Sequence, residues 1–402
     1  MKKSFFTIVL VVYNLCTLNA QVKSKFRHIN PIDTASFIKP HFNFEIPLAL
    51  IAGGMLSYGF DRNFRGMKDF YFPTFKQSYD DYTQYLPAAV MFGLKSCGVE
   101  SRSSWKEMLL SDAISVSIMA SLVNGLKYTI KKERPDGSSK KSFPSGHTAT
   151  AFMTATMLHK EYGHKSPWIS VGAYSCATLT GFTRQLNTRH WMSDVIVGAG
   201  IGILSVELAY LLSDLILNGK KKKNYSNYDS SCKNENLSFL GMQIGVKNYL
   251  TEFRLQDNKE LSIDYSSSIG IEGAWYCYKN LGIGGQMNLS SHLYDIDGEK
   301  QTVPFGTLSI STGPYYSIPI SKRFRCENKA LLGLSFIQRN NFTHKYVDIC
   351  NNLNYTLGTS ISYITNSDLA FKIFGEYKLI PNFINRKNGQ ELSMGLSLDY
   401  HF

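Results

Sequence analysis

Residues 392–402 read Leu-Ser-Met-Gly-Leu-Ser-Leu-Asp-Tyr-His-Phe, so that every second residue is apolar or aromatic. The same period of two runs through residues 281–289, Leu-Gly-Ile-Gly-Gly-Gln-Met-Asn-Leu. Successive side chains of a β-strand point to opposite faces of a sheet, so this alternation predicts strands with two different faces. We count eight such segments in the last part of the chain. They fall near residues 238–249, 267–278, 281–293, 304–316, 328–339, 353–364, 368–379 and 391–402.

The connections between these segments alternate in length. Residues 250–266, 294–303, 340–352 and 380–390 are long, 317–327 is intermediate, and 279–280 and 365–367 are tight. Membrane barrels have an even number of antiparallel strands of about 9–11 residues, with short periplasmic turns and longer outer loops. The sequence therefore predicts an eight-stranded antiparallel membrane β-barrel over residues 237–402, with both of its ends in the periplasm. The terminal Phe402 resembles the last residue of outer-membrane barrels. A soluble barrel or sandwich is the alternative, because each strand signal is weak.

From about residue 42 to residue 217, the apolar residues occur instead in runs of helical length. They predict a bundle of about six helices. The runs are 46–58, 85–94, 108–126, 148–158, 169–179 and 195–217. Most of the runs are too short or too polar to span a bilayer, and 108–126 carries Asp112 and Asn124. The exception in length is 195–217, which carries Glu207 and Asp214. A central acid costs roughly 2.5–3.5 kcal/mol on insertion, so we expect a bundle outside the membrane core.

The first 20 residues have the organisation of a secretory signal. Lys2 and Lys3 precede an apolar run over residues 5–13, and the small residue Ala20 comes just before Gln21. We expect a signal peptide at 1–20, a helical domain at 21–217 and a basic polar linker at 218–236, where Lys220 to Lys223 interrupt the apolar pattern. An uncleaved anchor is the alternative at the N-terminus.

Composition narrows the class of protein. The chain has 402 residues, of which 44% are hydrophobic and 18% charged, and this excludes a disordered tail. The net charge of +12 fits either an anionic partner or a solvated basic face. No Cys/His pattern has metal-ligand spacing. Six cysteines follow the signal segment, and their pairing stays open: Cys97, Cys176, Cys232, Cys277, Cys326 and Cys350.

Three short stretches in the helical half contain the residues that carry chemistry. In the first, Lys127 and Arg134 lie seven apart, close to two helical turns, so both cations can share a face until Pro135 ends the helix. In the second, residues 144–147, Pro-Ser-Gly-His, lead into a helix near residue 148. The free N–H groups of a helix N-terminus bind phosphate, and His147 is placed to donate a proton.

The third stretch, residues 184–194, combines an anion ligand with a paired histidine. Arg184 offers a bidentate donor for phosphate oxygens. His190 and Asp194 are four apart, so on one helix face the carboxylate can hold one ring nitrogen while the other attacks. Each stretch taken alone is also typical of a solvated face, a turn or a surface hydrogen bond.

In this order and spacing, the three stretches together closely resemble the signature of the type-2 phosphatidic acid phosphatase superfamily, over about residues 100–217. Its members include lipid phosphatases, class A acid phosphatases and vanadium haloperoxidases. The resemblance implies that His190 attacks phosphorus to form a phosphohistidine, that Asp194 orients it, and that His147 protonates the leaving group. It also implies that no metal or other cofactor takes part. The implied phosphate ligands are Lys127, Arg134, Arg184 and the backbone around Ser145 and Gly146. Thr183 stands where many members have Ser, and keeps a hydroxyl.

The expected function is metal-independent hydrolysis of a phosphomonoester or pyrophosphate. The substrate would be a lipid of the phosphatidic acid, isoprenyl pyrophosphate or lipid A type, or a small phosphoester. The other expected partner is outer-membrane lipid, not nucleic acid, with the catalytic domain in the periplasm. The alternatives are an inner-membrane lipid phosphatase with a soluble β domain, a barrel adhesin or pore with an inactive phosphatase domain, and a haloperoxidase. Four flanking lysines either attract an anionic headgroup or keep a loop soluble: Lys131, Lys132, Lys140 and Lys141.

Overall fold

The computed structural model describes residues 44–217, 238–255, 259–278, 280–300, 304–321, 323–338, 352–365, 369–385 and 387–401. The expected signal peptide at 1–20, the linker at 218–236 and Phe402 lie outside these residues, as do Cys232 and Cys350. The other four cysteines after residue 20, namely Cys97, Cys176, Cys277 and Cys326, are free thiols.

The chain forms two compact units. The first comprises Met1–Ala52, Ser78–Arg184 and Asp194–Asp229, and the second comprises Gly53–Gln77, Gln185–Ser193 and Ser230–Phe402. The segment that contains His190 is therefore grouped with the barrel rather than with the other predicted site residues.

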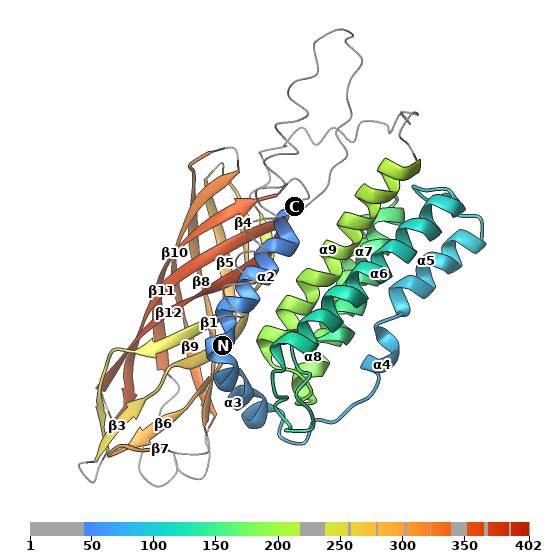
Figure 1. The fold of residues 1–402 in the computed structure, drawn as a ribbon. Helices are drawn as coiled ribbons and strands as arrows, with labels where there is room; N and C mark the ends of the chain where they lie inside the picture. The colour runs from blue at the N-terminus through green and yellow to red at the C-terminus, as the bar shows by residue number, and fades with distance from the viewer. Residues whose placement is uncertain are drawn as a thin grey trace, which may run out of the picture. The chain divides into compact units, whose positions relative to one another are not determined.

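All six predicted helical runs form helices. They are α2 (Glu45–Ser57), α5 (Leu86–Ser96), α6 (Trp105–Ile130), α7 (Gly146–Tyr162), α8 (Pro167–Leu186) and α9 (Met192–Leu217). Within the first unit, α7 packs against both α5 and α6 (Figure 1). The prediction missed two short helices, α3 (Asp61–Tyr71) and α4 (Asp80–Thr83), and the 3-10 turn η2 (Tyr58–Phe60) between α2 and α3.

Helix α6 is longer than the run that predicted it. Ser104 caps its start, because the Ser104 side chain accepts the Glu107 N–H and the Glu107 side chain accepts the Ser104 N–H. The resulting 26 residues are long and apolar enough to cross a membrane, as are the 26 residues of α9. The apolar stretch of α9 is mostly buried in the protein, whereas that of α6 is mostly exposed. The run at 108–126, which we expected to be too polar to span a membrane, therefore lies in a helix with the length and hydropathy of a span.

Two glycines bring α9 against the beginning of α7. A Cβ atom added at Gly198 would lie 2.6 Å from the Ser145 carbonyl oxygen, and one at Gly202 would lie 2.3 Å from that of Ala149. The backbones touch at these points, so no side chain fits between them. The close approach also lets the Asp194 carbonyl accept the Ser145 N–H at 3.0 Å.

We expect Gly202→Ala to destabilise the helical unit. The new methyl group must displace the backbone of α7, and overpacking of this kind costs about 1–3 kcal/mol. The matched control is Gly172→Ala in α8, where an added Cβ meets nothing within 4 Å. Thermal unfolding followed by helical circular dichroism compares the two variants, and equal midpoints would contradict the close packing of α7 and α9.

All eight predicted strands are confirmed, and they close into an antiparallel barrel (Figure 1). β1 (Phe239–Tyr249) pairs with both β12 (Lys387–His401) and β4 (Ser266–Tyr276), which completes the ring. The other barrel strands are β5 (Leu281–His292), β8 (Phe305–Pro319), β9 (Phe324–Gln338), β10 (Asn352–Ile364) and β11 (Leu369–Ile384). A small second sheet contains β2 (Phe253–Arg254), β3 (Glu260–Ile263), β6 (Tyr294–Ile296) and β7 (Glu299–Lys300).

Two of the predicted connections are shorter than expected. Residues 380–390 are not a long loop, because β11 and β12 remain paired out to Ile384 and Lys387 after a register shift that begins at Ile380. Ile380, Phe383 and Ile384 are buried in an apolar cluster, and this burial keeps the segment extended. The connection predicted at 317–327 shrinks in the same way, since β8 continues to Pro319 and β9 begins at Phe324.

The barrel has its charged residues inside and its apolar residues outside. Lys329 Nζ lies 2.7 Å from carboxylate oxygens of both Glu272 and Glu376, and all three side chains are buried. Lys372 Nζ lies 2.9 Å from a Glu327 carboxylate oxygen. By contrast, many large apolar side chains of the strands are exposed, among them Leu240, Ile283, Leu357, Ile373 and Met394. This distribution is typical of a membrane barrel and the reverse of a soluble one. Side chains occupy its interior, as expected for eight strands.

Helix α3 packs on the outside of this barrel. The Tyr71 hydroxyl lies within hydrogen-bond distance of the Ser290 and Thr307 carbonyl oxygens, at 3.0 and 3.2 Å. A Cβ atom added at Gly306 would lie 2.2 Å from the Phe70 ring. These strand positions flank β6 and β7, so α3 sits at the end of the barrel that carries the second sheet.

Candidate active site

The Pro-Ser-Gly-His stretch forms the N-terminus of α7. The helix begins at Gly146, two residues earlier than predicted, and the Ser145 hydroxyl accepts the Thr148 N–H at 3.4 Å. A Cβ atom added at Gly146 would lie 3.5 Å from Lys127 Nζ. The ammonium group of the first motif therefore reaches the helix end of the second, as a shared phosphate site requires.

Arg134 joins this group from a loop rather than from a helix. α6 ends at Ile130, and Lys131 follows with a left-handed φ of 51°. The backbone N–H of Arg134 then donates to the Ser139 carbonyl at 2.9 Å. The predicted helix face shared by Lys127 and Arg134 is therefore wrong. Burial and the charges of Arg134 and Arg184 nevertheless lower the pKa of Lys127.

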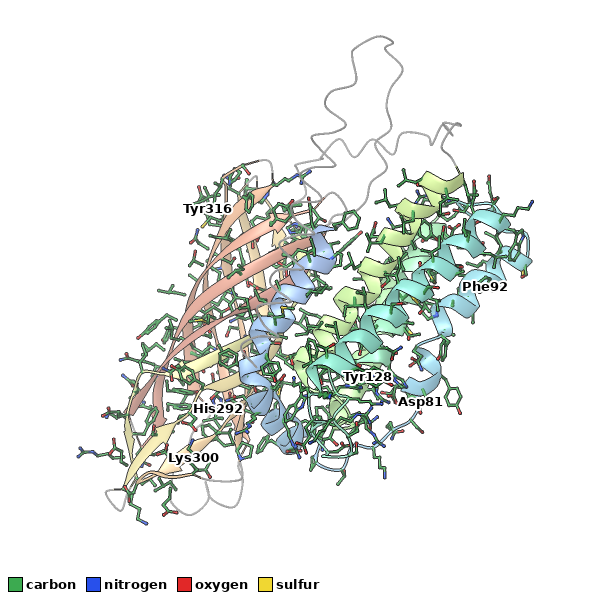
Figure 2. The ribbon with its side chains drawn as sticks, viewed as in Figure 1. Asp81, Phe92, Tyr128, His292, Lys300 and Tyr316 are labelled. Carbon is green, nitrogen blue, oxygen red and sulfur yellow. The ribbon has the colours of Figure 1, made fainter. Side chains whose placement is uncertain are left out.

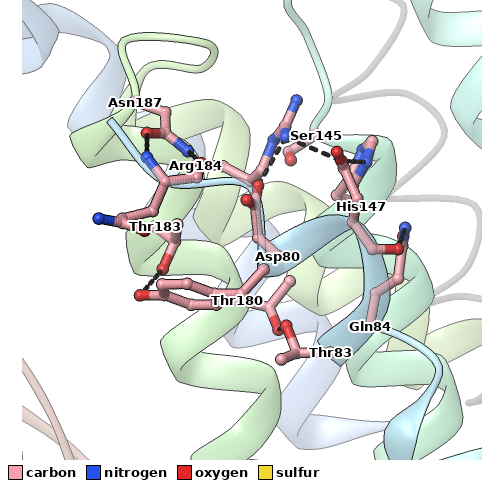
Figure 3. Close-up of polar contacts among 12 residues, drawn as sticks. Asp80, Thr83, Gln84, Ser145, His147, Thr180, Thr183, Arg184 and Asn187 are labelled. Carbon is pink, nitrogen blue, oxygen red and sulfur yellow. Dashed lines mark hydrogen bonds and ion pairs between the residues drawn. The ribbon is translucent and has the colours of Figure 1, made fainter. Parts of the chain in front are cut away.

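Arg184 lies near the end of α8 and is almost completely buried. One of its terminal nitrogens is 2.6 Å from Asp80 Oδ2 and 3.5 Å from Asp81 Oδ1 (Figure 3). Its Nε is buried and makes no hydrogen bond to any residue that the structure describes. Burying a guanidinium nitrogen without a partner is unfavourable, and a bound oxyanion is the ligand that it fits best.

His147 faces the same acidic pair. Its Nε2 atom lies 2.8 Å from Asp81 Oδ1. Burial and the nearby Arg184 lower the pKa of His147 below its ordinary value, while Asp81 and Asp80 partly oppose this shift. Sequence reasoning missed both aspartates. Their only signal is an isolated Asp-Asp pair in a polar stretch, and the chain order does not connect it to the three motifs.

The helix α4 that carries these aspartates is fixed to α8. The Tyr79 hydroxyl lies 2.8 Å from the Thr183 hydroxyl, and the Thr83 hydroxyl lies 2.9 Å from that of Thr180 (Figure 3). The hydroxyl that Thr183 keeps thus helps to hold α4 beside Arg184. Asp81 and Tyr128 lie toward the same end of the first unit (Figure 2).

His190 lies in the loop before α9 and not on a helix. α8 ends at Leu186, α9 begins at Met192, and Thr188 between them has a left-handed φ of 56°. The helix-face pairing predicted for His190 and Asp194 is therefore wrong, and the orientation of one by the other stays a prediction. The His190 side chain is only 2% exposed.

Asp61 of α3 fixes the end of this loop. Its carboxylate accepts the Ser193 N–H at 3.0 Å and lies 2.7 Å from the Ser193 hydroxyl oxygen. The carboxylate thus satisfies the Ser193 N–H, one of the free donors at the start of α9.

Asp194 is fully buried and is bound by residues of the loop between α6 and α7. Its Oδ1 lies 2.9 Å from Lys132 Nζ, and its Oδ2 accepts the Ser142 hydroxyl. Of the flanking lysines, Lys132 therefore pairs with Asp194 through a side chain that is only 9% exposed, so it does not serve to keep the loop soluble. Lys141 stays on the surface, where its ammonium lies 4.6 Å from the centre of the Tyr128 ring.

Comparisons with known proteins identify a family over part of the chain and several similar proteins. Residues 108–216 match the PAP2 superfamily and form a domain of that superfamily. The chain is 43% identical over 179 residues to the lipid A 1-phosphatase of Porphyromonas gingivalis, which covers 44% of this chain and 40% of that protein. The chain thus spans less than half the length of this relative.

Solved structures similar to this chain fall into two groups. Aquifex aeolicus LpxE is 21% identical, covers 44% of this chain and 98% of its own, and gives a TM-score of 0.27. Neisserial surface protein A is 12% identical, covers 41% of this chain and 97% of its own, and gives a TM-score of 0.30. OprG of Pseudomonas aeruginosa is 10% identical, covers 42% and 97%, and gives a TM-score of 0.34.

Proposed function

We propose that the chain is a phosphatase that removes phosphate from a lipid through a phosphohistidine on His190. The observation that carries the proposal is the group of cations around the N-terminus of α7. Lys127 Nζ lies 3.5 Å from the position that a Cβ atom at Gly146 would take. Arg184 is buried, and its Nε makes no hydrogen bond to the described part of the chain. Cations and oriented N–H groups of this kind stabilise the equatorial oxygens of a phosphoryl transition state.

The proposed reaction has two steps. His190 attacks phosphorus, the bond from phosphorus to the leaving oxygen breaks, and His147 gives that oxygen a proton. Water then attacks the phosphohistidine, His147 takes the proton from water, and the phosphorus–nitrogen bond breaks to release phosphate. Asp194 supports the positive charge that His190 gains. Lys127, Arg134, Arg184 and the backbone at Ser145 and Gly146 hold the phosphate oxygens.

The proposed substrate is a lipid A type phosphate. It is supported by the similarity of residues in this chain to a lipid A 1-phosphatase and by the apolar outer face of the barrel, which fits an outer membrane. We place the catalytic side in the periplasm, as the signal segment and the short turns favour. An inner-membrane enzyme with a soluble β domain fits the barrel poorly, because a soluble domain would expose this apolar face to water.

A panel of substrates tests the proposal. The purified full chain is assayed for released phosphate with lipid A, phosphatidic acid, isoprenyl pyrophosphate and p-nitrophenyl phosphate. We expect turnover of lipid A to exceed that of the others. Equal turnover of all four substrates would support the phosphatase activity but contradict the choice of lipid A as substrate. No phosphate release from any of them would contradict the proposed function and favour an inactive domain.

Activity is expected to survive chelators and to be blocked by vanadate. The proposed site uses cations and helix N–H groups where other phosphatases use metal ions, and vanadate mimics the phosphoryl group that they bind. Assays in excess EDTA and in micromolar to millimolar vanadate measure both effects. Loss of activity in EDTA that zinc or magnesium restores would show that the enzyme depends on a metal.

A further inference from the structure

Asp81 and His147 form a pair that resembles the carboxylate–histidine pairs of other enzymes. The carboxylate Oδ1 lies 2.8 Å from Nε2 of the ring, while Nδ1 bonds to no residue in the described ranges. The His147 side chain is 32% exposed and that of Asp81 is 53% exposed, so both can be reached by a substrate. A ring held at one nitrogen has a defined orientation and tautomer, which leaves the other nitrogen for proton transfer.

The charges around His147 make such a partner necessary. Arg184 disfavours the protonated ring, as does burial, whereas Asp81 and Asp80 favour it. Lys127 adds another cation beside the preceding residue, Gly146. Asp80 is itself bound to Arg184 at 2.6 Å, so Asp81 is the carboxylate that contacts the ring directly. A site built from cations to bind phosphate would otherwise deprotonate its own proton donor.

The position of Asp81 is fixed by its own element. The Asp81 carbonyl accepts the Gln84 side-chain amide at 2.9 Å, and the Gln84 carbonyl accepts the Thr154 hydroxyl at 2.8 Å. Thr154 lies two turns beyond His147 on α7, so the same helix carries the ring and anchors the segment that holds its partner.

We propose that Asp81 is a positioning residue for His147, which orients the ring and favours its protonated form for the leaving group. This inference rests on the proposed function, because it assumes that His147 is the proton donor. Asp81 stands outside all three motifs and acts through His147, not on the phosphorus. The substrates that need Asp81 most are those with a poor leaving group, such as the alkoxide of an alkyl or lipid phosphate.

The test is Asp81→Asn, assayed as kcat against pH on an alkyl phosphate and on p-nitrophenyl phosphate. Asparagine removes the negative charge, so the pKa of His147 falls and the alkaline limb of kcat moves to lower pH. A shift of about one pH unit corresponds to a tenfold loss of kcat above that limb. The loss should be smaller with p-nitrophenyl phosphate, since its leaving group departs without a proton.

Three further variants separate this role from others. Asp81→Glu keeps the charge and should restore the alkaline limb in part. Asp80→Asn loosens Arg184 and should raise KM more than it shifts the limb. Glu100→Gln, whose carboxylate is 88% exposed, is the control and should change neither. Circular dichroism confirms that each variant is folded.

The experiment distinguishes failure of this inference from failure of the proposed function. An unchanged pH limb and unchanged leaving-group dependence in Asp81→Asn, with an active wild type, would overturn the inference and keep the proposed function. A gain in kcat/KM without a shift would also overturn it, and would mean that Asp81 only competes with phosphate for Arg184. A wild type with no activity on any phosphoester would instead contradict the proposed function itself.

Discussion

His190→Ala is expected to abolish turnover, with a fall in kcat on the order of 10⁴-fold or more, as loss of a nucleophile usually gives. The alanine variant has no ring nitrogen to attack phosphorus, so the covalent intermediate cannot form. A substrate with labelled phosphate, quenched under alkaline conditions in which phosphohistidine survives, measures the intermediate directly. The wild type should retain label on the protein, and the variant should retain none.

A second histidine variant gives the matched control for this experiment. His164 lies on the surface just after α7 and belongs to none of the motifs. His164→Ala should therefore keep both turnover and the labelled intermediate. If His190→Ala still forms phosphohistidine, another histidine is the nucleophile, and the role assigned to the loop before α9 is wrong.

The strands could be predicted from sequence because one physical rule governs all of them. In a barrel with lipid outside and polar side chains inside, every strand must alternate, and the register of β1 with β12 shows the same alternation on both partners. The rule failed at residues 380–390 because Ile380, Phe383 and Ile384 are buried beyond the barrel itself. The alternating pattern also does not predict the small second sheet at one end of the barrel.

Motif spacing predicted which candidate residues lie close together better than it predicted the elements that carry them. Motif spacing identified Lys127, Gly146 and Arg184, which the structure brings together. It placed Arg134 and His190 on helices, although both lie in loops. Asp80 and Asp81 could not be found, because α4 is short, lacks periodicity and meets the motifs only through contacts with α7 and α8.

We expect the protein to be recovered entirely in one membrane fraction. A barrel with an apolar outer face, such as Ile283 and Ile373, requires a membrane, and for an exported protein we propose that this is the outer membrane. The protein should therefore be recovered with the outer membrane, and its barrel should resist detergent until it is boiled, which changes its mobility on a gel. Deletion of Phe402 should impair assembly. Recovery of the protein in the inner membrane would contradict the proposed location.

Protease treatment of intact cells then decides which side carries the catalytic domain. The loop between α6 and α7 exposes Lys131 and Lys140, which trypsin cuts readily. If this domain is periplasmic, as proposed, the loop is protected until the outer membrane is opened. Cleavage in intact cells would be consistent with a barrel in the outer membrane but would place the catalytic domain at the cell surface. A lipid A substrate would then be met in the outer leaflet.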